Sequence, residues 1–116
     1  MEWYLTKIVF RIVCSDGNHA PQFDEQLRLL TAANYQEALQ KASSLGESAQ
    51  HRFRNERQQW VHWQFINVAE LTRLGKLEDG TELHYRIAEP DNADRYIALI
   101  HEKAARIACD SYATGC

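Results

Sequence analysis

Residues 60–86 read W-V-H-W-Q-F-I-N-V-A-E-L-T-R-L-G-K-L-E-D-G-T-E-L-H-Y-R. The aromatic and β-branched composition of residues 59–68 favours a strand, because such side chains pack well on a pleated surface. The dipeptide Asp79-Gly80 is a strong hairpin signal, since a type I′ turn needs positive φ at both central positions. Alternating apolar residues then predict another strand over 81–87. We therefore expect this stretch to form the centre of a small β-sheet.

Two more strands are expected before this stretch. Residues 3–14 are β-branched and aromatic, and their even positions, from Tyr4 to Cys14, form a nearly continuous apolar face. Their odd positions form a mixed face, whereas a solvated sheet face shows a cleaner alternation. Residues 22–32 predict a second strand, antiparallel to the first, in which Phe23, Leu27 and Leu29 share a face.

Two amphipathic helices complete the expected set of elements. Asn34 is a suitable N-cap, and an apolar stripe rich in alanine follows it at helical spacing, so we expect a helix from Asn34 to about Asn55. A second apolar stripe predicts a helix over 93–109. The predicted order is strand, strand, helix, strand, strand, helix. The simplest solution is an α+β fold with a four-stranded, mainly antiparallel sheet and both helices packed on one face.

The composition is that of one ordinary globular domain. The chain has 116 residues, 45% of them hydrophobic, and a net charge of −3, so we expect a single domain over 1–116 with a flexible tail at 110–116. The acidic balance argues against a dedicated nucleic-acid binder. The three cysteines show no metal-site spacing, and Cys14 and Cys109 are expected to be buried thiols. Without a signal peptide or an apolar run of about 20 residues, we expect a cytoplasmic protein with no membrane span.

The chain also resembles a known family. Its segments W-Y-L-T-K-I-V-F-R, A-A-N-Y-Q-E-A, W-Q-F-I-N-V-A-E-L and L-E-D-G-T-E-L-H-Y-R, taken in this order, are similar to the bacterial domain of unknown function family 4288, over about residues 3–87. The resemblance implies a bacterial, intracellular, single-domain protein. It implies no activity and no catalytic residues.

The sheet is expected to expose an apolar surface on the side without helices. Both faces of the longest strands carry large apolar groups, and two helices cannot cover them all. We therefore expect a non-enzymatic interaction module that self-associates as a homodimer through this face, or binds another protein. Because aromatic residues dominate interface energetics, the expected anchors are taken from the two longest strands: Trp3, Leu5, Val9, Trp60 and Trp63.

Two alternative sites stay open. His62, Glu82 and His84 could converge from neighbouring strands as an acid–base pair, half a metal site or a small-ligand pocket, although they also suit a solvated sheet face. Arg52, Arg54 and Arg57, close in sequence to Phe53 and Trp60, could bind nucleic acid weakly, although they also suit the solvated end of a helix.

No motif of a known cofactor or catalytic site supports a further expectation. The sequence contains no H-x-x-x-H or Cys/His spacing for a metal, no G-x-S-x-G nucleophile motif, and neither G-x-G-x-x-G nor a P-loop for a nucleotide. We therefore expect no cofactor, no metal and no catalytic residues.

Overall fold

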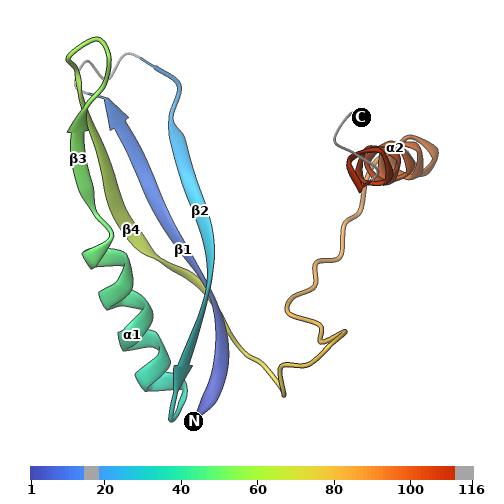
Figure 1. Ribbon diagram of the computed structural model, residues 1–116, viewed down its shortest axis with the longest axis horizontal. Helices are drawn as coiled ribbons and strands as arrows, with labels where there is room; N and C mark the ends of the chain where they lie inside the picture. The colour runs from blue at the N-terminus through green and yellow to red at the C-terminus, as the bar shows by residue number, and fades with distance from the viewer. Residues whose placement is uncertain (15–18, 112–116) are drawn as a thin grey trace. The chain divides into compact units, whose positions relative to one another are not determined.

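The computed structural model describes residues 1–14 and 19–111 of the chain (Figure 1). It divides into two compact units, Met1–Tyr85 and the residues from Arg86 onward. The first unit contains an antiparallel sheet of four strands in the order β2-β1-β4-β3, together with helix α1. The second unit contains helix α2. The predicted α+β class and ββαββα order are confirmed, whereas the expectation of a single domain stays a prediction.

Strand β1, Glu2–Cys14, lies inside the sheet and supplies the largest fully buried side chains of the described residues. Its even residues Tyr4, Thr6, Ile8 and Phe10 are fully buried, as the apolar pattern predicts. Strand β2, Gln22–Ala32, pairs with β1 antiparallel and adds Leu30 and Ala32 to the same buried face. Thr6 is the one buried polar side chain among the described residues, and its hydroxyl donates to the Glu70 carbonyl at 3.0 Å.

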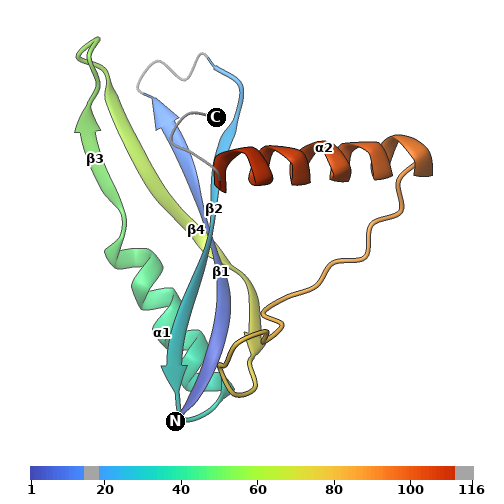
Figure 2. The same ribbon diagram turned by 45° about the vertical axis from the view of Figure 1, so that its right-hand side comes forward.

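Helix α1, Tyr35–Ser48, packs on this buried face along one half of the sheet (Figures 1 and 2). The side chain of Asn34 accepts a hydrogen bond from the Glu37 amide at 2.8 Å, so the expected N-cap is confirmed. The helix turns its smallest residues to the sheet, Ala38, Ala42 and Gly46, and all three are buried. A small-residue contact lets the helix approach closely: a Cβ at Gly46 would lie 2.3 Å from Cε1 of Phe65.

The helix ends seven residues before the predicted boundary near Asn55. Residues His51–Arg54 form strand β3 instead, paired antiparallel with the start of β4, Trp60–Arg73. The link between them is a tight loop in which the Asn55 side chain accepts hydrogen bonds from the Arg57 and Gln59 amides. The predicted helical extension is wrong because these residues alternate with period two: His51 and Phe53 lie on one face, and Arg52 and Arg54 on the other.

Strand β4 is longer than the predicted strand over 59–68, because it continues to Arg73. Its pairing with β1 shifts register twice, between Lys7 and Ile8 and between Val9 and Phe10. Each shift leaves one extra residue on β4, Ala69 and Ile66 respectively, as in a β-bulge. Without these bulges, Val68 and Leu71 would not both face the core.

The predicted strand over 81–87 does not form, and these residues carry no regular structure. A turn is present at the expected place, with the Thr81 amide donating to the Glu78 carbonyl at 3.0 Å. Of the two central residues of this turn, Gly80 has a positive φ and Asp79 does not. That pattern belongs to a type II turn rather than the type I′ turn of a two-residue hairpin, so the turn does not lead the chain back along β4.

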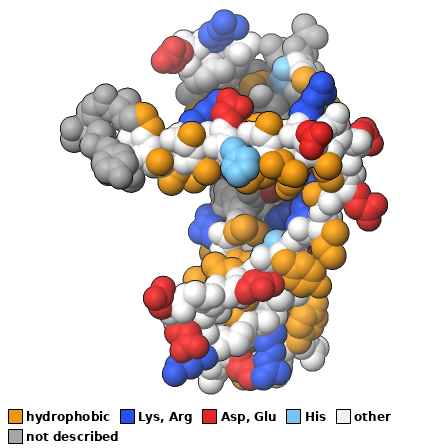
Figure 3. All heavy atoms as spheres, turned by 90° about the vertical axis from the view of Figure 1, so that its right-hand side faces the viewer, with side chains coloured by type: hydrophobic (Ala, Val, Ile, Leu, Met, Phe, Trp, Pro, Cys, Tyr) orange, Lys and Arg blue, Asp and Glu red, His pale blue; other side chains and the backbone are white. Residues whose placement is uncertain are grey.

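Helix α2 spans Ala93–Ser111, close to the predicted 93–109. The Asn92 side chain caps it by accepting from the Arg95 amide at 3.0 Å. Hydrophobic side chains run along the helix (Figure 3), and within the second unit by itself this apolar stripe is exposed. Its packing against the sheet stays a prediction. The tail expected at 110–116 begins within this helix, and residues 112–116 lie outside the described part.

Strand β2 forms one edge of the sheet. Near its end, the Lys41 ammonium of α1 donates a hydrogen bond of 2.7 Å to the Thr31 carbonyl.

Within the described residues, neither helix is long and apolar enough to cross a membrane.

Candidate interaction surface

The sheet face opposite α1, here called the outer face, is formed by the odd residues of β1 and their partners on β2 and β4. Alternate residues of a strand point to opposite sides. The even residues of β1 pack towards α1, so Trp3, Leu5 and Val9 lie on the outer face. Trp3 is 41% exposed and Val9 is half-buried, whereas Leu5 is only 7% exposed. Leu5 is therefore covered within one protomer and is not an accessible anchor.

Strand β2 contributes apolar side chains that the sequence reasoning did not assign to an interaction surface. Phe23, Leu27 and Leu29 pair with Arg11, Lys7 and Leu5, which places all three on the outer face. They share a face, as predicted, and their exposed fractions are 54%, 55% and 47%. Regular alternation was the available signal, but it could not show that this face lies away from the helix.

The residues of β2 that alternate with Phe23, Leu27 and Leu29 lie on the inner face of the sheet, and near the start of the strand they are polar. Asp24, Gln26 and Arg28 form a hydrogen-bonded row beside the core: the Gln26 amide donates to Asp24 at 2.6 Å, and Arg28 donates to Gln26 at 2.7 Å. The indole N–H of Trp63 also donates to Asp24, at 3.0 Å. Polar residues can occupy this side of the sheet because they satisfy one another.

A line of ion pairs crosses the outer face. Lys7 lies between Glu25 of β2 and Glu70 of β4, at 3.4 and 3.6 Å, and His84 lies 3.9 Å from the same Glu70. On one side of this line the surface is apolar and contains Trp3, Leu27 and Leu29. On the other side lies the β3–β4 hairpin, whose outer face carries arginine, histidine and tryptophan. The outer face therefore has an apolar end and a basic end.

The three tryptophans occupy three different environments. Trp3 lies at the apolar end of the outer face, and Trp60 lies at the basic end with 41% exposure. Trp63 lies on the opposite side of the sheet, in line with Ile12. Its ring stacks on His51 at a centroid distance of 5.4 Å and on Phe53 at 6.0 Å. Trp63 is thus separated from the outer face that the other expected anchors share.

The structure does not bring His62, Glu82 and His84 to one point. Glu82 and His84 line the same open hollow, together with Thr72 and Leu74. His62 pairs with Val13, whereas Glu70, which His84 approaches, pairs with Lys7. These positions are six residues apart along β1, or about 20 Å at the rise of a strand.

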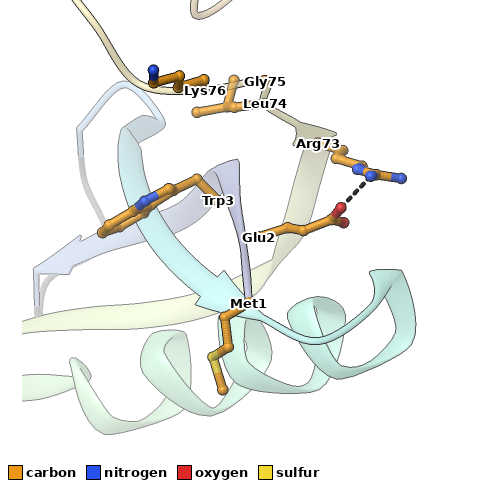
Figure 4. A pocket seen from close by; sticks show the side chains of 7 residues that line it. All are labelled: Met1, Glu2, Trp3, Arg73, Leu74, Gly75 and Lys76. Atoms are coloured by element: carbon orange, nitrogen blue, oxygen red, sulfur yellow. Dashed lines mark hydrogen bonds and ion pairs between the residues drawn. The ribbon is translucent and has the colours of Figure 1, made fainter.

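A second hollow lies where β1 begins and β4 ends (Figure 4). Glu2 points to Arg73 and forms an ion pair with it, while Trp3 points to the other side of the strand. The remaining lining residues, Met1, Leu74, Gly75 and Lys76, include no histidine, cysteine or hydroxyl side chain. Over the described part of the chain, no three His, Cys, Asp or Glu residues are grouped to hold a metal.

The expected cysteine environments are only partly found. Cys14 is a free, half-buried thiol at the end of β1. Cys109 is exposed on α2 when the second unit is taken by itself, so its expected burial stays a prediction together with the packing of that helix. Cys116 lies outside the described residues.

The model of a family described as a domain of unknown function, DUF4288, matches residues 3–85 of the chain. The chain belongs to the DUF4288 family. The DUF4288 match ends at the boundary of the first compact unit, Met1–Tyr85, so the sheet and α1 form the family domain and α2 follows it. No curated protein and no solved structure shows significant similarity to the chain.

Proposed function

We propose that this DUF4288 protein is a non-enzymatic interaction module that forms a homodimer through the apolar end of its outer face. The observation that carries the proposal is the group of large, half-exposed side chains on β1 and β2: Trp3, Leu27 and Leu29. Leu29 is paired with Leu5, and Leu27 lies two residues before it on the same face. Isolated exposed hydrophobic residues are common, but a contiguous group of this kind is typical of a binding surface.

A second copy is the partner that this surface suits best. In a twofold dimer the same patch meets itself, so an apolar surface is its own complement. The ion pairs of Lys7 with Glu25 and Glu70 border the patch, in the way that a polar rim surrounds an apolar interface centre. Glu25 and Glu70 are already paired within one protomer, which reduces charge repulsion between two copies. The sequence-based expectation of a bacterial, cytoplasmic setting is retained in this proposal.

The substitution Leu27→Glu tests the proposal. Leu27 is more than half exposed, so the monomer should tolerate the change, whereas a dimer would have to bury an unpaired carboxylate. That burial costs about 3 kcal/mol or more, which corresponds to roughly a 100-fold weaker dimer. Sedimentation velocity over a range of concentrations should show a dimer for the natural protein and a monomer for Leu27→Glu.

Tyr35→Glu is the matched control. Tyr35 is 57% exposed and begins α1, away from the outer face, and an acidic residue is compatible with the first turn of a helix. This variant should remain a dimer. A natural protein that sediments as a monomer at high micromolar concentration, or equal dimer affinity for both variants, would refute self-association through this surface.

A further inference from the structure

The basic end of the outer face contains a cluster of four residues on the β3–β4 hairpin, Arg52, Arg54, Trp60 and His62, here called the hairpin cluster. Antiparallel pairing places Arg52 opposite His62 and Arg54 opposite Trp60, so all four side chains share one face. The guanidinium carbons of Arg52 and Arg54 each lie 4.9 Å from the centroid of the Trp60 ring. The two guanidinium carbons are consequently at most twice that distance apart.

The charge of this cluster is not neutralised within the described part of the protein. None of the ion pairs between described residues involves Arg52 or Arg54, although the whole chain has a net charge of −3. Two neighbouring guanidinium groups repel each other unless an anion lies between or above them. The Trp60 ring offsets part of this repulsion, because the negatively polarised face of an indole attracts a cation that lies over it.

Stacking on Trp60 also orders the two arginine side chains in advance. An ordered side chain loses less conformational entropy when it binds a ligand. The planar fork of each guanidinium can donate two parallel hydrogen bonds to a phosphate. A stacked guanidinium still presents its second flat face, which can stack on a nucleobase.

The shape of the surface indicates an extended ligand. The hairpin cluster lies on an open strand surface, whereas small molecules usually bind in concave pockets that enclose most of their area. Strand β3 is also an edge strand, so a chain-like ligand can pass over it without obstruction from a fifth strand. We propose that the hairpin cluster binds the phosphate backbone of single-stranded nucleic acid, with the arginines on phosphates and adjacent bases against the guanidinium planes.

The number of arginines sets a quantitative expectation. For single strands, the logarithm of the binding constant falls with the logarithm of salt concentration with a slope of about −0.7 per phosphate neutralised. Two arginines therefore predict a slope of roughly −1.4. Binding through so few contacts is weak and is best observed at low salt.

Fluorescence anisotropy with a labelled single-stranded oligonucleotide of mixed sequence, titrated with the full chain, tests this site. The double variant Arg52→Ala with Arg54→Ala should lose most of the binding and most of the salt dependence. A second double variant, Arg52→Gln with Arg54→Gln, keeps alkyl stems beside Trp60 and should lose binding in the same way. It provides the test if the alanine variant aggregates. Circular dichroism confirms that each variant is folded.

The matched control removes the same number of positive charges elsewhere. Arg95 and Arg106 are exposed residues of α2, and their double alanine variant should bind the oligonucleotide like the natural protein. Polyglutamate serves as a competitor that imitates an acidic protein partner. The proposal is wrong if the natural protein gives no anisotropy change at low salt, if the Arg52 and Arg54 variants bind unchanged, or if polyglutamate competes as well as unlabelled oligonucleotide.

Discussion

Gly46 determines how closely α1 can lie against the sheet. Its Cα hydrogen atoms face the ring of Phe65, and an added methyl group would come within 2.3–2.8 Å of three ring atoms. Phe65 itself lies on β4 opposite Phe10, a fully buried residue of β1, and the two rings are 6.0 Å apart. A shift of the Phe65 ring would therefore be transmitted to the centre of the core.

Gly46→Ala should consequently destabilise the protein. Alanine favours a helix over glycine by about 1 kcal/mol, but overpacking a core costs about 1–3 kcal/mol, so we expect a net loss of about 1 kcal/mol in the free energy of unfolding. Urea denaturation followed by circular dichroism measures it. Gly75→Ala is the control, because nothing lies within 4 Å of its added Cβ. Equal stability of Gly46→Ala and the natural protein would contradict the close packing.

The tryptophans indicate from the sequence that the sheet has apolar groups, but they do not show which face each of them occupies. Their enrichment on the long strands correctly indicated apolar groups on both sides of the sheet. Trp60 and Trp63 lie three residues apart, and the pairing with β3 and β1 puts them on opposite faces. The accessible apolar anchors of β2 were visible as an alternating pattern, but only the register with β1 assigns them to the outer face.

At the level of elements, β1, β2 and both helices follow from apolar periodicity and caps, and β3 does not. β3 has four residues, two of them arginine, and all four are exposed. A segment of this kind has too little apolar contrast to be distinguished from the polar end of a helix. It becomes a strand because β4 offers a partner and Asn55 closes the loop between them.

The N-cap of α1 is a prediction that can be measured at this scale. Asn34→Ala removes the acceptor for the Glu37 amide, and loss of such a cap costs about 1 kcal/mol. Asn34→Ser should retain most of the stability, since serine is an equally good cap. Urea unfolding of both variants checks this. If the two substitutions prove equally harmful, the cap hydrogen bond is not the stabilising interaction.

The positions of the two bulges of β4 could not be anticipated from its sequence. Strict alternation after Phe65 would place Asn67 in the core and turn Val68 outward. The extra residues Ile66 and Ala69 reverse this, so that Val68 and Leu71 reach the core cluster. The position of a bulge depends on the partner strand, and for that reason a pattern within one strand does not locate it.

At the level of the whole molecule, the family domain should fold without α2. Every buried hydrophobic side chain of the described chain lies between Tyr4 and Leu74. We expect a fragment of residues 1–85 to unfold cooperatively in urea. Its three tryptophans report on tertiary structure by fluorescence, and circular dichroism reports on the sheet. Coincident transitions support the prediction; a fragment that is unfolded or aggregates in buffer would contradict it.

The architecture was more accessible from sequence than the candidate surfaces were. Element order and fold class depend on local periodicity, which a sequence displays directly. The outer face depends on which side α1 covers, and the hairpin cluster depends on a strand that the sequence did not reveal. The separation of His62 from Glu82 and His84 likewise follows from strand register, because neighbouring residue types alone cannot fix distances along a sheet.

The contact between Lys41 and Thr31 bears on the behaviour of the protein in concentrated solution. The edge of β2 offers unpaired backbone groups, and such edges can recruit strands from other molecules into fibrils. A lysine ammonium held 2.7 Å from an edge carbonyl occupies one of these acceptors and puts a charge where an incoming strand would have to lie. Neutralising Lys41 would therefore be expected to remove a safeguard against amyloid-like stacking, even though the side chain contributes nothing to the core.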